Sequence, residues 1–434
     1  MATWHELRTW ALPGMRIKRW IFTVLAGVVV MNASVGWAVY DWLSPADRGG
    51  LWAIPLLMLG VAVVVVGVGR LMALVVEVLR PGAQLVDAVY ASRLRRRGPK
   101  IVAIGGGTGL ATLLRGLKAY SDNLTAIVTV ADDGGSSGRL RQELGVLPPG
   151  DIRNCLTALA GEERLLTDLF GFRFPGDREL GGHAFGNLFL AALIGVTGDP
   201  LRAIQAACQV LAVRGTVVPT TAEMMTLYAR FEDGTVVEGE SNITAWRRRV
   251  TDIWCAPARP APVPAALKAI EEADLIIMGP GSLYTSLVPH LLVPEMREAL
   301  RSAHAPLLYV CNVMTQPGET DAFTVADHVR VLMRYGGEGL VQHVLVNEAL
   351  PSRLRASYEA QGQHPVEIDW DALMAMGVQP IRGAFLEEGE VVRHHAGLLA
   401  AAIMTWWEAW AAQERSWVVR SAASQAPASA ARTP

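Results

Sequence analysis

The fold is decided by one stretch of sequence, IVAIGGGTGLATLLRGL at residues 101–117. Its first four residues are apolar, which predicts a buried strand over Ile101–Ile104. Leucines then recur at helical spacing, at positions 110, 113, 114 and 117. A strand, a glycine-rich turn and a helix in this order are the opening of a βα unit on a parallel sheet.

The turn of this unit is built from five small residues, Gly105, Gly106, Gly107, Thr108 and Gly109. Bare backbone N–H groups at the start of a helix favour an anion such as phosphate. The dinucleotide fingerprint is incomplete, because a leucine stands where its third glycine would fall, and no Lys-Ser/Thr pair follows as in a P-loop. NAD binding and ATP hydrolysis therefore lose support, and a tight turn without a ligand remains the alternative.

The same alternation of apolar runs and helical spacing continues along the chain. Further strands are predicted at Leu124–Val130, Leu275–Met278, Leu307–Cys311 and Val341–Val346, a hairpin around Asp233-Gly234, and a last helix at about Ala396–Trp410. The pattern predicts an α/β protein with a Rossmann-like, mostly parallel sheet and helices on both faces.

An acidic loop follows the second strand and contains Asp132, Asp133, Gly134, Gly135, Ser136 and Ser137. An acid at this place can bond ribose hydroxyls, while the adjacent acid can hold Mg²⁺ or accept a proton from an attacking hydroxyl. The glycines and serines are typical of a second phosphate site. A solvated loop whose acid caps a helix is the alternative.

Two more polar motifs come before the middle of the chain. In PPGDIRN, Asp151 is expected as a helix N-cap with Arg153 and Asn154 in the first turn, and capping alone is an open alternative. In GGHAFGN, His183 and Asn187 are four residues apart and are expected on one helical face if the helix starts as early as His183. A structural role for the histidine remains open, whereas Asn187 is the better candidate for a ligand contact.

Two polar loops follow apolar strands in the second half of the chain. GPGSLYTS offers Gly281, Ser282 and Tyr284, and NVMTQPGETD offers Asn312, Thr315 and Gln316 as groups that can read a base or a sugar. Because ligands of open parallel sheets sit at the carboxyl ends of the strands, all these loops are expected at one edge. Ordinary turn chemistry is the alternative. The adjacent His394 and His395 are interpreted as structural.

Composition limits the classes of partner. The chain has 434 residues, 51% of them hydrophobic, and a formal net charge of -2. This balance and the lack of a basic stripe interleaved with aromatics predict no nucleic-acid partner. Four cysteines lie far apart without a CxxC pair, which favours thiols in a reducing compartment.

Two apolar segments near the N-terminus, at about 20–43 and 51–76, are each long enough to cross a bilayer as a helix. The short turn-like link between them predicts a transmembrane hairpin. Basic residues precede the first segment and follow the second, which places both ends in the cytoplasm. A secretory signal peptide is disfavoured because no cleavage pattern stands out. A soluble helical hairpin is disfavoured because the run Val61–Val66 has no polar face.

The expected organisation is therefore a cytoplasmic N-terminus at 1–19, a transmembrane hairpin at 20–79, a basic juxtamembrane linker at 80–99, a Rossmann-like ligand-binding domain at 100–412 and a disordered tail at 413–434. The expected location is the cell membrane, with the lipid bilayer as one partner.

Six motifs occur in order, GGGTG, TVADDGGSSGRLR, PPGDIRN, GHAFGNL, GPGSLYTS and NVMTQPGETD. Together they resemble the bacterial gluconeogenesis factor family, which is related in fold to 2-phospho-L-lactate transferase. The resemblance spans about residues 100–410 and implies binding of UDP-sugars such as UDP-N-acetylglucosamine. It also implies a role in cell shape and envelope synthesis during growth on gluconeogenic carbon sources, with envelope-synthesis proteins and a second copy of the chain as candidate partners.

Two functions remain open from the sequence. The first is a membrane-anchored binding and regulatory protein for a nucleotide sugar, without a required cofactor. The second is an Mg²⁺-dependent phospho-transferase that uses Asp132 and Asp133 to hold the metal and assist an attacking hydroxyl. The residues favour the first, because clustered anion-binding loops occur without a convincing catalytic constellation. The transferase activity rests on analogy of fold alone.

Overall fold

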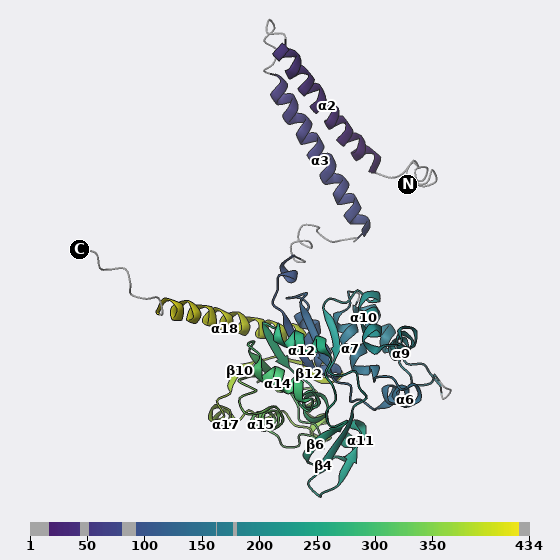
Figure 1. The fold of residues 1–434 in the computed structure, drawn as a ribbon, viewed down its shortest axis with the longest axis vertical. Helices are drawn as coiled ribbons and strands as arrows, with labels where there is room; N and C mark the ends of the chain where they lie inside the picture. The colour runs from purple at the N-terminus through teal and green to yellow at the C-terminus, as the bar shows by residue number, and fades with distance from the viewer. Residues whose placement is uncertain (1–16, 44–51, 80–92, 162, 177–179, 425–434) are drawn as a thin grey trace, which may run out of the picture. The chain divides into compact units, whose positions relative to one another are not determined.

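The structure is a computed structural model that describes residues 17–43, 52–79, 93–161, 163–176 and 180–424 (Figure 1). It divides into two compact units, residues 1–93 and 94–434, which are described separately. Most of the expected N-terminal segment, most of the basic linker and the last ten residues of the expected tail lie outside the described residues.

The first unit is a pair of helices, α2 (Ile17–Leu43) and α3 (Ala53–Leu79). Within them, Arg19–Asp41 and Ala53–Ala73 are long and apolar enough to cross a membrane, by length and composition. Glycines let the two helices approach closely, because a Cβ added at Gly27 or Gly60 would lie 2.7 Å or 2.6 Å from a side chain of the other helix.

The centre of the second unit is a seven-stranded sheet in which every neighbouring pair of strands is parallel. This confirms the expected Rossmann-like α/β fold. In spatial order the strands are β10 (Gln379–Gly383), β9 (His343–Asn347), β8 (Leu307–Val310), β7 (Leu275–Met278), β1 (Ile101–Gly105), β2 (Leu124–Val128) and β3 (Thr216–Pro219).

Alternate residues of the central strand β1 belong to two separate hydrophobic cores. Ile101 and Ala103 pack with one set of helices, and Val102 and Ile104 pack with the other. The first set contains α5 (Gly107–Leu117), α7 (Pro149–Leu159), α8 (Glu163–Gly171), α9 (Phe185–Thr197), α10 (Pro200–Val210) and α18 (Ala396–Ser424). The second contains α12 (Pro264–Glu271), α13 (Val288–Leu291), α14 (Pro294–Ser302), α15 (Val325–Gly336) and α17 (Trp370–Ala375). Helices thus cover both faces, as predicted.

A smaller antiparallel sheet joins β5 (Val236–Glu238), β4 (Thr226–Phe231) and β6 (Val250–Ala256). The turn Asp233-Gly234 connects β4 to β5, which confirms the expected hairpin, whereas β6 was not expected. Together with α11 (Glu240–Trp246), this sheet lies at one end of the second unit (Figure 1). The other elements are α6 (Gly135–Leu144), α16 (Arg355–Glu359), a π-helix η2 (Leu283–Leu287) and the hairpin of β11 (Leu386–Glu388) and β12 (Val392–His394).

The last helix differs from the sequence expectation. It was expected to end near Trp410 and to lead into a disordered tail from residue 413, but α18 continues to Ser424 and extends away from the rest of the second unit (Figure 1). The added segment, AAQERSWVVRSAAS, contains four alanines and two arginines, which have high helix propensity, and no proline or glycine that would end the helix. All four cysteines are free thiols, as expected.

Candidate functional site

The glycine loop lies where the order of the sheet reverses. From β1 the chain runs outward through β2 to β3, and it later returns to the other side of β1 with β7. In open α/β sheets, ligands bind at such a switch point, outside the carboxyl ends of the strands. The loop after β1 and the loop after β7 touch there, because a Cβ on Gly109 would overlap the carbonyl oxygen of Pro280. Gly107 has a φ of +64°, which favours glycine at that position.

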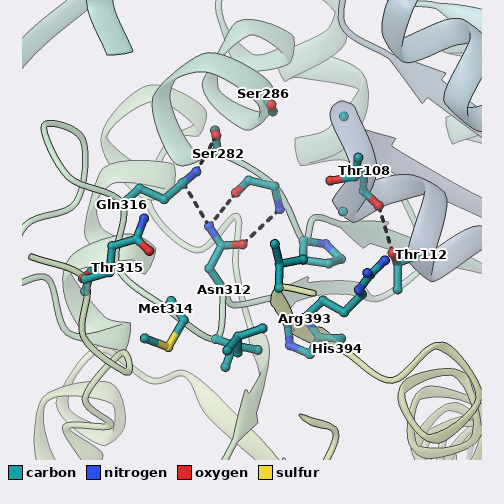
Figure 2. Close-up of a pocket in the computed structure, with 18 of the residues that line it drawn as sticks. Thr108, Thr112, Ser282, Ser286, Asn312, Met314, Thr315, Gln316, Arg393 and His394 are labelled. Atoms are coloured by element: carbon teal, nitrogen blue, oxygen red, sulfur yellow. Dashed lines mark hydrogen bonds between the residues drawn. The ribbon is translucent and has the colours of Figure 1, made fainter. Parts of the chain in front are cut away.

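A cavity of about 530 Å³ opens at this switch point (Figure 2). The glycine loop and the loops after β7 and β8 form its walls, and the β11–β12 hairpin adds a further side. It is lined by Gly106, Gly107, Thr108, Gly109, Thr112, Pro280, Gly281, Ser282, Ser286, Asn312, Val313, Met314, Thr315, Gln316, Tyr358, Gln363, Val391, Val392, Arg393 and His394. Figure 2 shows Thr108 and Thr112 across the cavity from Asn312 and Gln316.

Side-chain amides form one wall of the cavity. The backbone N–H of Gly281 donates to Oδ1 of Asn312 at 3.1 Å, and Nδ2 of Asn312 donates to the Gly281 carbonyl at 2.8 Å. Nε2 of Gln316 donates to Oγ of Ser282 at 2.8 Å. These bonds hold the loops after β7 and β8 together and fix the orientation of both amides. The structure therefore brings five of the predicted residues, Gly281, Ser282, Asn312, Thr315 and Gln316, to the cavity with the glycine loop.

Tyr284 does not join them. Its side chain is buried in the hydrophobic core, and burial raises the pKa of its hydroxyl to about 12. The reason is local: η2 begins one residue earlier and turns this side chain into the core, away from the sheet edge. The expectation that Tyr284 contacts a ligand at the sheet edge is therefore not supported by its position.

The acidic-loop residues form a second polar cluster beside the glycine loop. Oγ of Ser136 lies 3.1 Å from Nδ1 of His183 and accepts a hydrogen bond from Nδ2 of Asn187 at 3.0 Å. Oδ1 of the same asparagine accepts from Arg153 at 2.9 Å, and that arginine also donates to Asn154. Three separate motifs of the sequence thus meet in one hydrogen-bond network.

Two expectations about these motifs are wrong in detail. His183 does not share a helical face with Asn187, because α9 begins at Phe185, and the two side chains meet on Ser136 instead. Asp151 is not the N-cap of α7, because that helix begins at Pro149 and places Asp151 in its first turn. Proline is well suited to start a helix, so the helix begins earlier than the capping pattern predicted.

Asp151 instead lies against the glycine loop. A Cβ on Gly106 would be 2.6 Å from Oδ2 of Asp151, so only glycine lets the loop pass this carboxylate. Burial, and then the nearby charge of Asp132, raise the pKa of Asp151 to about 6. Asp132 is also close by, because a Cβ on the neighbouring Gly150 would lie 2.9 Å from its Oδ2. A carboxylate therefore stands next to the loop on which phosphate is expected.

Glu240 is a member of this cluster that sequence reasoning missed. Burial, followed by the charges of Asp132 and Asp133, raises its pKa to about 7. Glu240 is the first residue of α11, which lies outside the main sheet. The first turn of α11 is held by a hydrogen bond of 2.9 Å, which the N–H of Ser241 donates to Oδ1 of Asp133. The sequence gives no sign of this role, because the search for polar residues at the carboxyl ends of parallel strands does not cover a segment outside the main sheet. Arg393 and His394, which line the cavity from β12, were missed for the same reason.

The crowded carboxylates raise the question of a divalent cation. Burial, and then the charges of neighbouring carboxylates, raise the pKa of Asp151 and Glu240, and a hard cation with oxygen ligands would offset the second of these causes. Within the described part of the chain, no three His, Cys, Asp or Glu side chains are grouped as a complete metal site. Mg²⁺ commonly binds through one or two carboxylates, with water and ligand phosphates completing its shell, and Asp132 and Asp133 are the candidates for that role.

Comparison with known proteins identifies the family. Residues 101–386 match the family model for 2-phospho-L-lactate transferase CofD. A putative gluconeogenesis factor from Nostoc sp. is 49% identical over 421 residues, covering 92% of each chain. The gluconeogenesis factor of Bacillus subtilis is 48% identical over 308 residues, which cover 70% of this chain and 97% of its own.

A solved structure supports the same family assignment as these two relatives. The crystal structure of a UPF0052 family protein from Bacillus halodurans is 45% identical, has a TM-score of 0.68, and matches over 71% of this chain and 99% of its own. The Bacillus proteins thus match over almost their whole length, whereas the Nostoc alignment extends into the N-terminal unit. This chain therefore belongs to the gluconeogenesis factor family and carries the CofD-type domain over residues 101–386.

Proposed function

We propose that this protein binds a nucleotide sugar, such as UDP-N-acetylglucosamine, at the switch-point cavity and regulates envelope synthesis and cell shape during gluconeogenic growth. One observation carries the proposal: the start of α5 and a wall of fixed amides face each other across a cavity of about 530 Å³. The volume lies within the range of small-molecule sites, about 300–1,000 Å³.

The two sides of the cavity suit the two ends of such a ligand. The diphosphate lies along Gly107 and Thr108 at the start of α5, where the helix dipole favours negative charge. The amide wall of Asn312 and Gln316 offers donors and acceptors in fixed positions to a base or a sugar. Asp132 and the serines of the acidic loop are not among the residues that line this cavity.

The regulatory part of the proposal rests on the family and on the first unit. Two apolar helices able to span a membrane would hold the domain at the bilayer where envelope precursors are assembled. In this arrangement both ends of the chain lie in the cytoplasm, ligand binding shifts the conformation of the cavity loops, and an envelope-synthesis protein recognises the shifted form.

Isothermal titration of the full chain in lipid nanodiscs with UDP-N-acetylglucosamine tests the proposal. We expect saturable binding, and we expect Asn312→Ala to weaken it, because the substitution removes the amide that holds the loop after β7. Asn123→Ala is the matched control, since Asn123 also donates to backbone carbonyls but lies at the opposite edge of the sheet. Absence of binding at millimolar ligand would refute the proposal.

The second candidate is a phospho-transferase, favoured by the CofD family match and by the carboxylates around the glycine loop. An acceptor hydroxyl oxygen would form a bond to phosphorus while the bond from phosphorus to the nucleoside monophosphate breaks, and a carboxylate of the cluster would take the hydroxyl proton. A bound Mg²⁺ would neutralise the diphosphate. Asp132 and Asp133 would hold it, and Asp151 would orient the loop.

Release of nucleoside monophosphate measures this activity directly. The full chain is incubated with a nucleoside-diphospho-lactate donor, a deazaflavin acceptor and Mg²⁺, with Asp133→Asn as the inactive comparison. Release that depends on the acceptor and is lost in Asp133→Asn supports a transferase. Titration of a nucleotide sugar without any release, across plausible donors, favours the regulatory function.

A further inference from the structure

A second cavity, of about 490 Å³, adjoins the main one. The two cavities share Thr112 of α5 and Arg393 of β12. In Figure 2 the side chain of Arg393 extends toward Thr112, so its guanidinium group stands at the junction of the two. The two cavities therefore meet at Thr112 and Arg393.

Three arginines from three separate elements surround this second cavity: Arg115 of α5, Arg164 of α8 and Arg393 of β12. They outnumber the two carboxylates of its lining, Asp168 and Glu387. A planar guanidinium group binds carboxylate and phosphate oxygens through paired N–H bonds, and several of them converging on one space are typical of an anion site.

The interior of the cavity carries further features that suit an anion. Thr167 belongs to the lining, and its hydroxyl oxygen is buried beneath the surface without a hydrogen-bond partner among the described residues. The long helix α18 begins at Ala396, which also lines the cavity, and a helix start favours negative charge. A helix start and three arginines thus line one cavity.

The spacing along α5 determines which part of a ligand can reach this cavity. Thr112 is one helical turn beyond Thr108, or roughly 6 Å along the axis, and Arg115 is almost one turn further. The two phosphates of a diphosphate share a single bridging oxygen, so both remain at the glycine loop. Only a group several bonds away from them reaches the arginines.

We infer that the second cavity is an anion subsite in which Arg115, Arg164 and Arg393 bind a carboxylate or phosphate carried on the distal, sugar end of the nucleotide ligand. This inference rests on the proposed function and names the class of ligand: a nucleotide sugar with an acidic group beyond its diphosphate. A separate small anion bound beside a neutral nucleotide sugar has the same chemistry and is distinguished in the experiment.

The test compares UDP-glucose with UDP-glucuronic acid, which differ only by a hydroxymethyl group and a carboxylate, in titrations of the full chain in nanodiscs. We expect the acidic sugar to bind about tenfold tighter, the gain of one charge-assisted hydrogen bond. Arg164→Gln should remove this preference while leaving UDP-glucose affinity within about twofold, because Arg164 lines the second cavity but not the main one. Arg202→Gln, on the exposed side of α10, is the matched control and should keep the preference.

A second arm adds millimolar inorganic phosphate to the UDP-glucose titration. Tighter binding of UDP-glucose, lost in Arg164→Gln, assigns the subsite to a separate anion. Equal affinities for the two sugars together with no effect of phosphate overturn the inference and leave the proposed function standing. If neither sugar binds, the proposed function falls and the inference falls with it.

Discussion

Asn312 and Gly281 exchange two hydrogen bonds, one from the Gly281 N–H to Oδ1 at 3.1 Å and one from Nδ2 to the Gly281 carbonyl at 2.8 Å. The Asn312 amide bonds both the N–H and the carbonyl of Gly281, as a neighbouring strand does for a residue in a sheet. The pair joins the loops after β7 and β8 just beyond their last common ladder bonds. The amide wall of the cavity depends on this junction.

Asn312→Asp is expected to weaken nucleotide-sugar binding by at least about tenfold. The carboxylate loses the donor to the Gly281 carbonyl and brings a negative charge into a cavity that is to receive a diphosphate. Isothermal titration in nanodiscs measures the affinity, and the melting temperature reports whether the fold is kept. Asn123→Asp also loses an amide donor, but at the far edge of the sheet, and should bind normally. An unchanged affinity in Asn312→Asp would place the ligand elsewhere.

Gly109→Ala should abolish binding and lower stability by about 1–3 kcal/mol, the usual cost of overpacking. The added Cβ would overlap the Pro280 carbonyl oxygen and lie 2.9 Å from its carbon, and backbone atoms cannot swing aside. Gly281→Ala is the matched comparison, because its Cβ meets nothing closer than 3.4 Å and should be tolerated. Thermal unfolding and titration of both variants check the pair. Equal behaviour would show that the two loops do not touch in solution.

The fold was predictable from the sequence because its signals are local. The strands β1, β7 and the core of β8 follow from short apolar runs, and the glycine turn before α5 follows from composition. The edge strands β3 and β10 were not predicted, since each is held by one neighbour only and carries prolines and polar residues.

The candidate site was predictable to the extent that it follows strand ends. Asn312 and Gln316 were found by that rule, which places the loops after parallel strands at one edge. Glu240 and Arg393 come from excursions outside the sheet, and no periodicity in the sequence indicates that α11 or β12 folds back over this edge. The inward rotation of Tyr284 depends on a π-helical turn, which sequence patterns do not indicate.

Glu319 gives the protein a pH-dependent weakness. Its buried carboxylate accepts from the N–H groups of Tyr284 and Thr285 at 3.0 and 3.1 Å, yet burial raises its pKa to about 7 from 4.5. The folded state thus binds a proton that the unfolded state releases. This contribution to stability is complete below about pH 4.5 and is lost as the pH rises through about 7.

Glu319→Gln should therefore raise the free energy of unfolding at pH 8 by up to about 3 kcal/mol, since each pKa unit corresponds to roughly 1.4 kcal/mol, and should match the wild type near pH 4.5. The glutamine carbonyl can keep both hydrogen bonds without burying a charge. Thermal unfolding across this pH range measures the difference. Glu272→Gln, at an exposed carboxylate whose pKa is lowered by Lys100, should show no such gain. If the free energies of unfolding of the wild type and of Glu319→Gln changed with pH in the same way, Glu319 would not be the source of this pH dependence.

Asp151 separates the two candidate functions. Its carboxylate stands beside Gly106, so a diphosphate on the glycine loop approaches a like charge once Asp151 is ionised, above about pH 6. With divalent cations removed, wild-type affinity for UDP-N-acetylglucosamine should fall as the pH rises through about 6, and Asp151→Asn should bind several-fold tighter than the wild type at pH 8 without that fall. Titrations in a chelator at several pH values measure both.

Adding Mg²⁺ completes the comparison. If a cation held by Asp132 and Asp133 also contacts the diphosphate, Mg²⁺ should tighten wild-type binding and should help Asp151→Asn less, because the Asp151 charge that the cation offsets is gone. Asp233→Asn, in the exposed hairpin turn, should follow the wild type throughout. A wild type indifferent to Mg²⁺ and pH would mean that the ligand phosphates stay clear of Asp151. The transferase would then lose its metal-assisted step.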